Sequence, residues 1–309
     1  MNGILNIDKP KDRTSFSIVA VVKRLSRERR VGHAGTLDPM ATGILPICLG
    51  QSTRIIRFLQ EARKTYGAEI ELGITTDTYD ASGNITGKGD PSTISIDQLE
   101  YTLTSFRGKI KQTPPMYSAV KHQGQPLYRL ARAGIEIKRK SRSAEIYQLE
   151  IKDWRPPVVE IELECSKGTY IRSIAHDLGQ LLGCGANLKS LIRLKYCLFN
   201  LENSVSLPQL EDAFHHGYWQ QYIYPIDSVI LNWRAVIISD SAERIIKNGG
   251  SLTLENFERI NCGNDFEITS PPQSSTNFLS RAYSSDGRFL GLLRFDSGKR
   301  LWQTEKIFQ

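Results

Sequence analysis

Two alternating segments near the middle of the chain most strongly constrain its fold. Between Val159 and Cys165, apolar residues alternate with three glutamates, and the same alternation from Tyr66 to Leu72 puts Tyr66 on the apolar side. Successive side chains of a strand point to opposite faces of a sheet. Each segment therefore predicts a half-buried strand.

Three segments have the apolar spacing of amphipathic helices. They are residues 15–25, residues 99–106 with a stop at Gly108, and residues 171–182 with a stop at Gly183. Helices and strands alternate along the chain, and some strands are spaced like hairpins. We therefore predict an α+β fold built on a mixed β-sheet.

The length of 309 residues fits about two domains. The composition changes near Leu231, so we predict one domain over residues 1–230 and a small β-rich domain over 231–309. The second domain should hold a helix near 242–248 and a strand over 288–295. Its segment 264–280, rich in Ser, Pro, Asn and Thr, predicts a flexible excursion.

The positive charge is concentrated in the first domain. The chain carries a net charge of +7, with eight basic and two acidic residues from Lys9 to Arg30, and ten basic and one acidic residue from Arg107 to Arg142. Residues 112–142 also show little periodicity and read as a long basic excursion, either a binding loop or disordered. A solvated charged face would explain one patch, but two patches favour a nucleic acid partner, because clustered Lys and Arg neutralise phosphates.

Several kinds of site and location can be excluded or are not expected. The chain has no phosphate-binding P-loop, no complete dinucleotide turn and no zinc deaminase motif. Its five histidines and five cysteines lack metal-binding spacing, so we expect no metal. No apolar run approaches the roughly 18 residues of a membrane helix, and no targeting segment is evident, so we expect a cytoplasmic protein without a membrane partner.

Asp38 is the acid with the most unusual setting. It lies between Gly35 and Gly43 and precedes Pro39, which disfavours the α conformation at Asp38. An isolated Asp-Pro pair is usually plain turn chemistry. A rigidly presented carboxylate can also act as a nucleophile without a partner base.

The segment around Asp38, residues 32–46, resembles the catalytic motif of the TruB family of tRNA pseudouridine-55 synthases. Four further blocks resemble that family in the same order. They are residues 6–10 with Thr14-Ser15, residues 64–66 with 73–78, residues 114–121, and residues 165–172 with 177–179. The resemblance extends from residue 5 to about residue 195.

This resemblance implies a cofactor-free isomerisation of uridine 55 in the T arm of tRNA. The uracil is flipped out, detached from its ribose and rejoined through C5. Asp38 matches the catalytic aspartate, and three routes stay open: attack on the base, attack on the sugar, or a glycal intermediate. The excursion 112–142 matches an RNA-binding insertion, and residues 231–309 resemble a PUA-type RNA-binding module.

The family pattern also assigns residues around the substrate. Tyr66 matches the tyrosine that stacks on the flipped base, and Tyr170 and Arg172 match a pair beside the pocket, with Arg172 able to pair with Asp38. His33 matches the residue that fills the space of the flipped nucleotide. Leu191 and Lys9 match a pocket-lining leucine and a supporting lysine. Without the motif, Tyr66 and Leu191 would be read as core, Tyr170 as a packed aromatic and Arg172 as a solvated charge.

Two departures from the family pattern affect this region. Asp12 stands where the family commonly has glycine, which puts the local loop geometry in doubt, and Ile192 stands where many members have arginine, which removes one RNA-facing charge. The alternative functions are a non-catalytic RNA-binding module or tRNA-folding chaperone, and another class of RNA-modifying enzyme. We expect a monomer that binds tRNA and not DNA.

Overall fold

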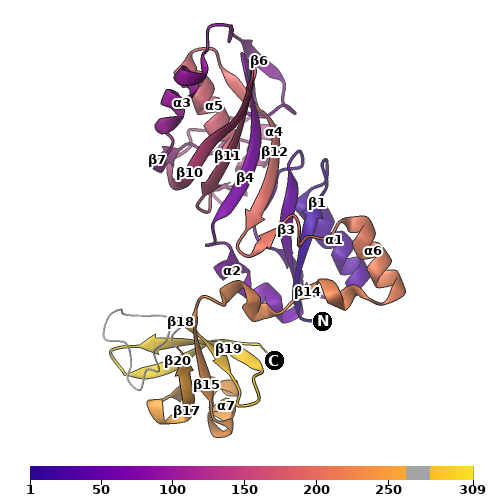
Figure 1. Cartoon of the computed structure of the whole chain (residues 1–309), viewed down its shortest axis with the longest axis vertical. Coiled ribbons are helices and arrows are strands. Elements are labelled where there is room, and N and C mark those ends of the chain that lie inside the picture. Colours follow the sequence, from indigo (N-terminus) through magenta and orange to yellow (C-terminus); the bar gives the residue numbers. More distant parts are fainter. Residues whose placement is uncertain (262–278, 309) are drawn as a thin grey trace.

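The protein is elongated, with a large mixed sheet and its helices at one end and a smaller β-rich unit at the other (Figure 1). The computed structural model describes residues 1–261 and 279–308. Most of the predicted excursion 264–280 therefore lies outside the described residues. The α+β architecture with a mixed sheet and a β-rich C-terminal part is confirmed.

The large sheet has ten strands in the order β14-β1-β3-β12-β4-β11-β10-β7, with β2 beside β3 and β13 beside β12. Neighbours pair antiparallel except β12 and β3, which pair parallel. The bounds are β1 Gly3–Lys9, β2 Val31–His33, β3 Thr42–Leu49, β4 Lys64–Leu72, β7 Gly108–Gln112, β10 Arg142–Arg155, β11 Val158–Cys165, β12 Ala186–Tyr196, β13 Phe199–Asn200 and β14 Ile223–Tyr224.

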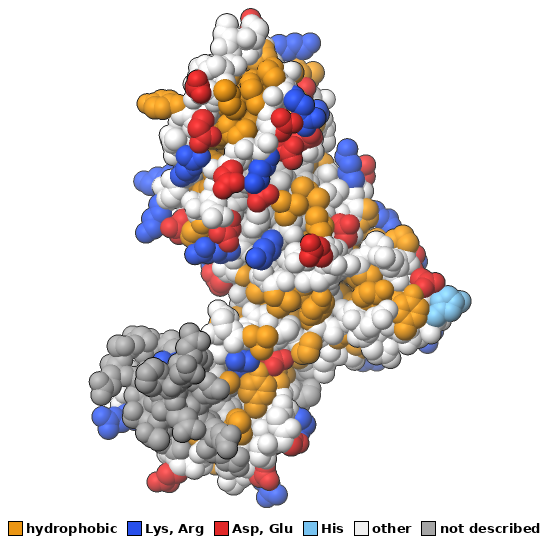
Figure 2. Space-filling model, in the orientation of Figure 1, with side chains coloured by type: hydrophobic (Ala, Val, Ile, Leu, Met, Phe, Trp, Pro, Cys, Tyr) orange, Lys and Arg blue, Asp and Glu red, His pale blue; other side chains and the backbone are white. Residues whose placement is uncertain are grey.

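The two alternating segments are central strands of this sheet, as predicted. In β4 and β11 every second side chain is buried, and Tyr66 of β4 lies opposite Leu163 of β11. Acidic and basic side chains are interspersed over this end of the molecule in Figure 2. One face of these strands is therefore apolar and buried, and the other face carries the half-buried glutamates.

Strand β3 was not predicted as a strand. Seven of its eight residues are buried, so it shows no alternation, and it contains Pro46. Proline has no N–H to donate to a neighbouring strand, so its presence argues against a central strand in a sequence-based prediction. The Pro46 carbonyl still accepts a hydrogen bond from the Ala34 amide at 3.0 Å. Strands buried on both sides are hard to identify by periodicity alone.

The helices are α1 Ser15–Ser26, α2 Ile56–Leu59, α3 Ile96–Thr104, α4 Leu127–Arg132, α5 Ile171–Leu182 and α6 Leu207–His216. Helix α1 is capped by the Thr14 side chain, and α5 ends at Gly183 with a φ of 78°, as predicted. Helix α3 ends at Thr104, earlier than predicted, because the chain turns over residues 102–107. Gly108 is the first residue of β7 and not the stop of the helix.

Short elements fill the connections. Two hairpins pair β5 Ile74–Thr76 with β6 Ile85–Lys88, and β8 Lys121–His122 with β9 Gln125–Pro126. Four 3-10 helices are η1 Gly50–Ile55, η2 Trp219–Tyr222, η3 Ile226–Ile230 and η4 Leu254–Asn256. The second hairpin and α4 lie within the basic excursion 112–142, which therefore has regular secondary structure between residues 121 and 132.

In the residues that the structure describes, the C-terminal unit is a six-stranded sheet with one α-helix. Its order is β16-β20-β19-β18-β15-β17, with bounds β15 Arg234–Ile238, β16 Ser251–Leu252, β17 Phe257–Asn261, β18 Leu279–Tyr283, β19 Phe289–Asp296, β20 Leu301–Ile307 and α7 Asp240–Lys247. Leu292 and Phe308 join an apolar cluster with Ile55 and Leu59. The Arg57–Glu305 ion pair adds a polar contact between the two units.

Candidate active site

The Asp38 loop is held by the elements on either side of it. It joins β2 to β3, and the Asp38 carbonyl accepts a hydrogen bond from the Ala41 amide at 3.1 Å. The buried Ser15 hydroxyl at the start of α1 accepts from the Leu37 amide at 2.9 Å and lies 3.1 Å from the Leu37 carbonyl. Gly43 has a φ of 91°, and a Cβ there would lie 2.4 Å from the Arg193 carbonyl oxygen. The backbone therefore presents Asp38 in one position.

Lys9 lies beneath this loop. Its side chain is fully buried, and its ammonium donates to the carbonyls of Pro10, Arg13 and Pro39 at 2.8, 2.7 and 3.2 Å. Burial lowers the pKa of Lys9 to about 8. Lys9 therefore contacts the carbonyl of the residue after Asp38, in line with the supporting lysine that the family pattern implies.

Asp12 preserves the loop geometry that a glycine would give. Its φ is 61°, in the left-handed region, and its amide donates to the Pro39 carbonyl at 2.8 Å. Aspartate is among the few residues that enter this region with modest strain. The departure from the family pattern at Asp12 therefore leaves the backbone around Asp38 in place.

Arg172 forms a two-pronged ion pair with Asp38. Its Nε lies 2.9 Å from Asp38 Oδ2 and its Nη2 lies 3.1 Å from Asp38 Oδ1. Nη2 and Nη1 also donate to the carbonyls of Tyr117 and Thr78 at 2.8 and 3.3 Å. The Arg172 side chain is 5% exposed and that of Asp38 33% exposed, so a substrate can reach the carboxylate but not the guanidinium.

Asp80 is a second carboxylate at the same guanidinium, and the sequence analysis did not single it out. Its Oδ2 lies 3.6 Å from Arg172 Nη1, and its Oδ1 accepts from the Thr78 hydroxyl at 2.8 Å and the Ser82 amide at 3.0 Å. The residue is 4% exposed. The only signal in the sequence was its place in an acidic turn, which ordinarily indicates a solvated loop.

This arrangement controls the charge of Asp38. Burial raises the pKa of the Asp38 carboxyl; the Arg172 guanidinium opposes this rise and Asp80 adds to it. Two carboxylates sharing one guanidinium leave a net negative charge on the group. Asp38 is therefore a more basic carboxylate than one paired with a single free arginine.

Two tyrosines share the electrostatic environment of Asp38. Burial raises the pKa of Tyr66, so its hydroxyl is protonated at neutral pH, and burial raises the pKa of Tyr170 as well. The Asp38 carboxylate contributes to both rises. The Tyr170 backbone is fixed by the buried Gln112, whose side chain accepts from the Tyr170 amide at 3.0 Å and donates to its carbonyl at 3.2 Å.

The other predicted site residues lie on the strands around this group. Leu191 of β12 is 7% exposed and lies opposite Ala68 of β4. His33 ends β2, and burial lowers the pKa of its imidazole, which is therefore neutral at neutral pH.

Arg193 is a second buried arginine that the sequence analysis missed. It is 1% exposed, and its Nε donates to the Ile44 carbonyl at 2.6 Å while Nη2 donates to the Gly35 carbonyl at 3.4 Å. It lies opposite Tyr66 in the β4–β12 pair. An arginine in a strand with alternating charge reads as exposed, so only the fold reveals that it supports the Asp38 loop.

Comparisons with known proteins show the family of this chain. The model of the TruB family pseudouridylate synthase N-terminal domain matches residues 23–171, and that of the tRNA pseudouridylate synthase B C-terminal domain matches residues 172–231. A curated tRNA pseudouridine synthase B from Dehalococcoides mccartyi strain BAV1 is 47% identical over 84% of this chain and 86% of its own length. This chain belongs to the TruB family of pseudouridylate synthases.

Further relatives of this TruB-family chain cover nearly all of it. The tRNA pseudouridine synthase B of Dehalococcoides mccartyi strain 195 is 42% identical over 100% of this chain and 97% of its own length. A solved structure titled "Crystal Structure of a Cbf5-Nop10-Gar1 Complex" matches with a TM-score of 0.75 at 26% identity, over 99% of this chain and 85% of that chain.

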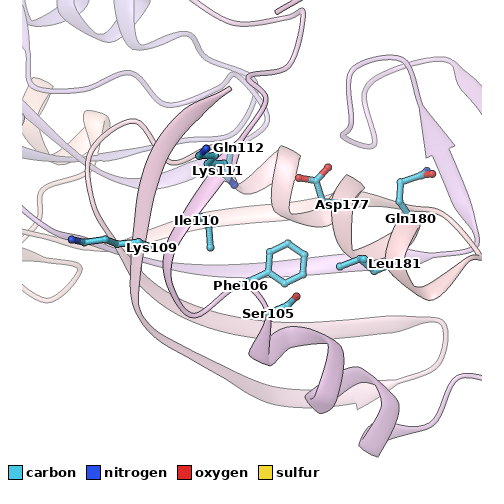
Figure 3. A pocket seen from close by; sticks show the side chains of 9 residues that line it. All are labelled: Ser105, Phe106, Lys109, Ile110, Lys111, Gln112, Asp177, Gln180 and Leu181. Carbon is cyan, nitrogen blue, oxygen red and sulfur yellow. The ribbon is translucent and has the colours of Figure 1, made fainter. Parts of the chain in front are cut away.

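The basic patches of this TruB-family chain are mostly on the surface. From Lys9 to Arg30 every basic residue except Lys9 is exposed, and from Arg107 to Arg142 every one except Arg139 is exposed. A hollow of about 460 Å³ lies where β7 meets α5, lined by Lys109, Lys111, Gln112 and Asp177 among others (Figure 3). Gln112 thus lines this hollow and also holds the backbone of Tyr170.

Two negative findings concern residues 1–261 and 279–308. No cluster of three or more His, Cys, Asp or Glu side chains there has an arrangement that could hold a metal ion. No helix within these ranges is long and apolar enough to cross a membrane.

Proposed function

We propose that this protein isomerises uridine 55 in the T arm of tRNA to pseudouridine, with Asp38 as its catalytic residue. The observation that carries the proposal is the Asp38 carboxylate, accessible on one side and held through both oxygens by the buried Arg172. The similarity to proteins named tRNA pseudouridine synthase B supports the substrate.

The reaction exchanges one ribose bond for another within the nucleotide. The bond from C1′ of the ribose to N1 of uracil breaks, the base turns, and a bond from C1′ to C5 forms. C5 loses its proton to solvent and N1 takes one up, so the product is an isomer of the substrate. Asp38 attacks the base or the sugar or assists a glycal route. In each case a pre-oriented carboxylate needs no reorganisation in the transition state.

The surrounding side chains serve the flipped base. Tyr66, buried and protonated, stacks on the uracil and serves as a proton-transfer group, while Leu191 and Tyr170 bound the pocket. The neutral His33 occupies the space that the flipped nucleotide leaves. Base flipping requires such aromatic and apolar surfaces, because the extruded base loses its stacking neighbours.

The remaining surface binds the rest of the RNA. We assign residues 1–230 to a catalytic domain whose basic insertion 112–142 binds the tRNA, and residues 231–309 to a PUA-like domain that makes auxiliary contacts. The exposed basic residues of both patches support electrostatic binding to phosphates. The protein acts in the cytoplasm as a monomer, without a cofactor or metal.

Tritium release tests the assignment. A tRNA transcript labelled with tritium at uracil C5 is incubated with the protein without added cofactor or metal, beside a transcript in which U55 is replaced by C. We expect release from U55 only, so the second transcript should release nothing above background. Release from both transcripts, or from neither, would contradict the site assignment.

Binding without release would support the alternative of an RNA-binding module or tRNA-folding chaperone. That alternative is measured separately, as the rate at which unmodified tRNA reaches its folded state in the presence of the protein. A chaperone activity can coexist with the isomerase, so only the absence of tritium release would favour it as the sole function.

A further inference from the structure

A ring stack joins the turn that carries Asp80 to the helix that carries Arg172. The rings of Tyr79 and His176 have centroids 3.9 Å apart and planes inclined by 11°. Tyr79 immediately precedes Asp80, and His176 lies one helical turn beyond Arg172 on α5. The stack therefore connects both sides of the Asp80–Arg172 ion pair.

Tyr79 adopts a backbone conformation that requires support. Its φ is 65°, in the left-handed region, which costs a residue with a bulky side chain about 1 kcal/mol or more. Its carbonyl accepts from the Leu188 amide at 3.0 Å, and the Ala81 amide donates to the Leu188 carbonyl at 2.9 Å. These bonds fix the turn to β12, and the stack fixes it to α5.

His176 is suited to stacking as a neutral ring. It is half-buried, its Nδ1 is buried without a hydrogen-bond partner among the described residues, and burial lowers the pKa of its imidazole, with the Arg139 guanidinium adding to the effect. A neutral imidazole stacks on a phenol without the desolvation cost of a charge. A ring used in this way needs no hydrogen bond to hold its place.

We propose that the Tyr79–His176 stack is a positioning device that holds Asp80 against Arg172 and thereby orients the Asp38 carboxylate. The inference rests on the proposed function, because it concerns how that site is assembled. Asp80 is 3.6 Å from Arg172, at the long end of an ion pair, so a small shift of the turn would separate them. Neither Tyr79 nor His176 touches the reacting atoms in this account.

The test compares variants in which the ring is kept or removed. His176→Leu removes the aromatic ring with little change in volume, whereas His176→Phe keeps a ring. We expect His176→Leu to lower the single-turnover rate of tritium release about three- to tenfold, the range of an aromatic pair, with the Kd for tRNA unchanged. His176→Phe should stay within about twofold of the wild type.

A second pair of variants covers the case in which His176→Leu does not fold. Tyr79→Gly accepts the positive φ while removing the ring, and Tyr79→Phe keeps it. We expect the glycine variant to be slowed as His176→Leu is, and the phenylalanine variant to match the wild type. A matched control is Trp219→Leu, which breaks the Phe214–Trp219 stack on the far side of the fold and should leave the rate unchanged.

Dependence on Asp80 separates positioning from general packing. In an Asp80→Asn background, already slowed, loss of either ring should have no further effect on the rate. Equal defects in His176→Phe and His176→Leu, or losses that multiply with that of Asp80→Asn, would overturn the inference. If the wild type released no tritium from U55, the proposed function would fail instead, which is a distinguishable result.

Discussion

Replacing Arg172 by lysine keeps the buried charge but removes its two-pronged geometry. Arg172 uses Nε and Nη2 for the two oxygens of Asp38, and Nη1 and Nη2 for the carbonyls of Thr78 and Tyr117. A lysine ammonium is a single point with three donors and cannot span these acceptors. At least one charge-assisted hydrogen bond to Asp38 is lost.

The structure sets the size of this effect. A hydrogen bond to a charged group contributes about 1.5–3 kcal/mol, so Arg172→Lys should slow the single-turnover rate roughly 10- to 150-fold. Binding of tRNA should change little, because the guanidinium is 5% exposed and does not reach the RNA. The loss therefore falls on the rate and not on the affinity.

The assay is tritium release with enzyme in excess over labelled tRNA, with the Kd measured in parallel by filter binding. Arg155→Lys is the matched control, because Arg155 has a 67% exposed side chain paired with Asp153 and should behave as the wild type. A folded Arg172→Lys protein with a rate within threefold of the wild type would refute the argument that two-pronged pairing orients Asp38.

Three further predictions concern the pH dependence of the rate, the stability of variants at Asp12, and the salt dependence of tRNA binding. Burial raises the pKa of Asp38, and the reaction needs its carboxylate. The rate should therefore fall as the pH drops through a value above the ordinary aspartate pKa of about 3.9. A pH–rate profile with its acid limb at or below that value contradicts this. Asp12→Val should lower the free energy of unfolding by about 1–2 kcal/mol in urea titrations while Asp12→Gly does not, and equal stabilities would show that the positive φ carries no strain. The affinity for tRNA should weaken steeply with salt, and a flat dependence would refute binding through the basic patches.

The sequence was informative where a local pattern, such as alternation or a short motif, indicates the structure. Alternation identified β4 and β11. The resemblance to the family indicated Asp38 through residues 32–46 and its partner Arg172 through residues 165–172. Glycine and proline on either side of Asp38 indicate a restricted backbone, but an isolated Asp-Pro pair is usually turn chemistry, so the catalytic role of Asp38 comes from the resemblance. Alternation also places Tyr66 on the apolar side of β4, but its place at the site comes from the resemblance to the family, because the pattern alone indicates a core tyrosine.

The contacts that support the site could not be predicted from the residues alone, because distant segments make them. Only the family pattern indicated a supporting role for Lys9, and Arg193 looks like a surface charge in the sequence. Each is buried against carbonyls that the fold brings to it. Asp80 reaches Arg172 across 92 positions in the chain, and nothing local marks it. Such contacts depend on strand order, which periodicity does not give.

The central claim is that the Asp38 carboxylate performs the chemistry, and Asp38→Asn tests it most directly. The amide has the same shape but cannot act as a nucleophile or base. We predict no tritium release from U55 under single-turnover conditions, with the Kd for tRNA within about threefold of the wild type. An Asn variant that forms pseudouridine at a rate near that of the wild type would contradict the account.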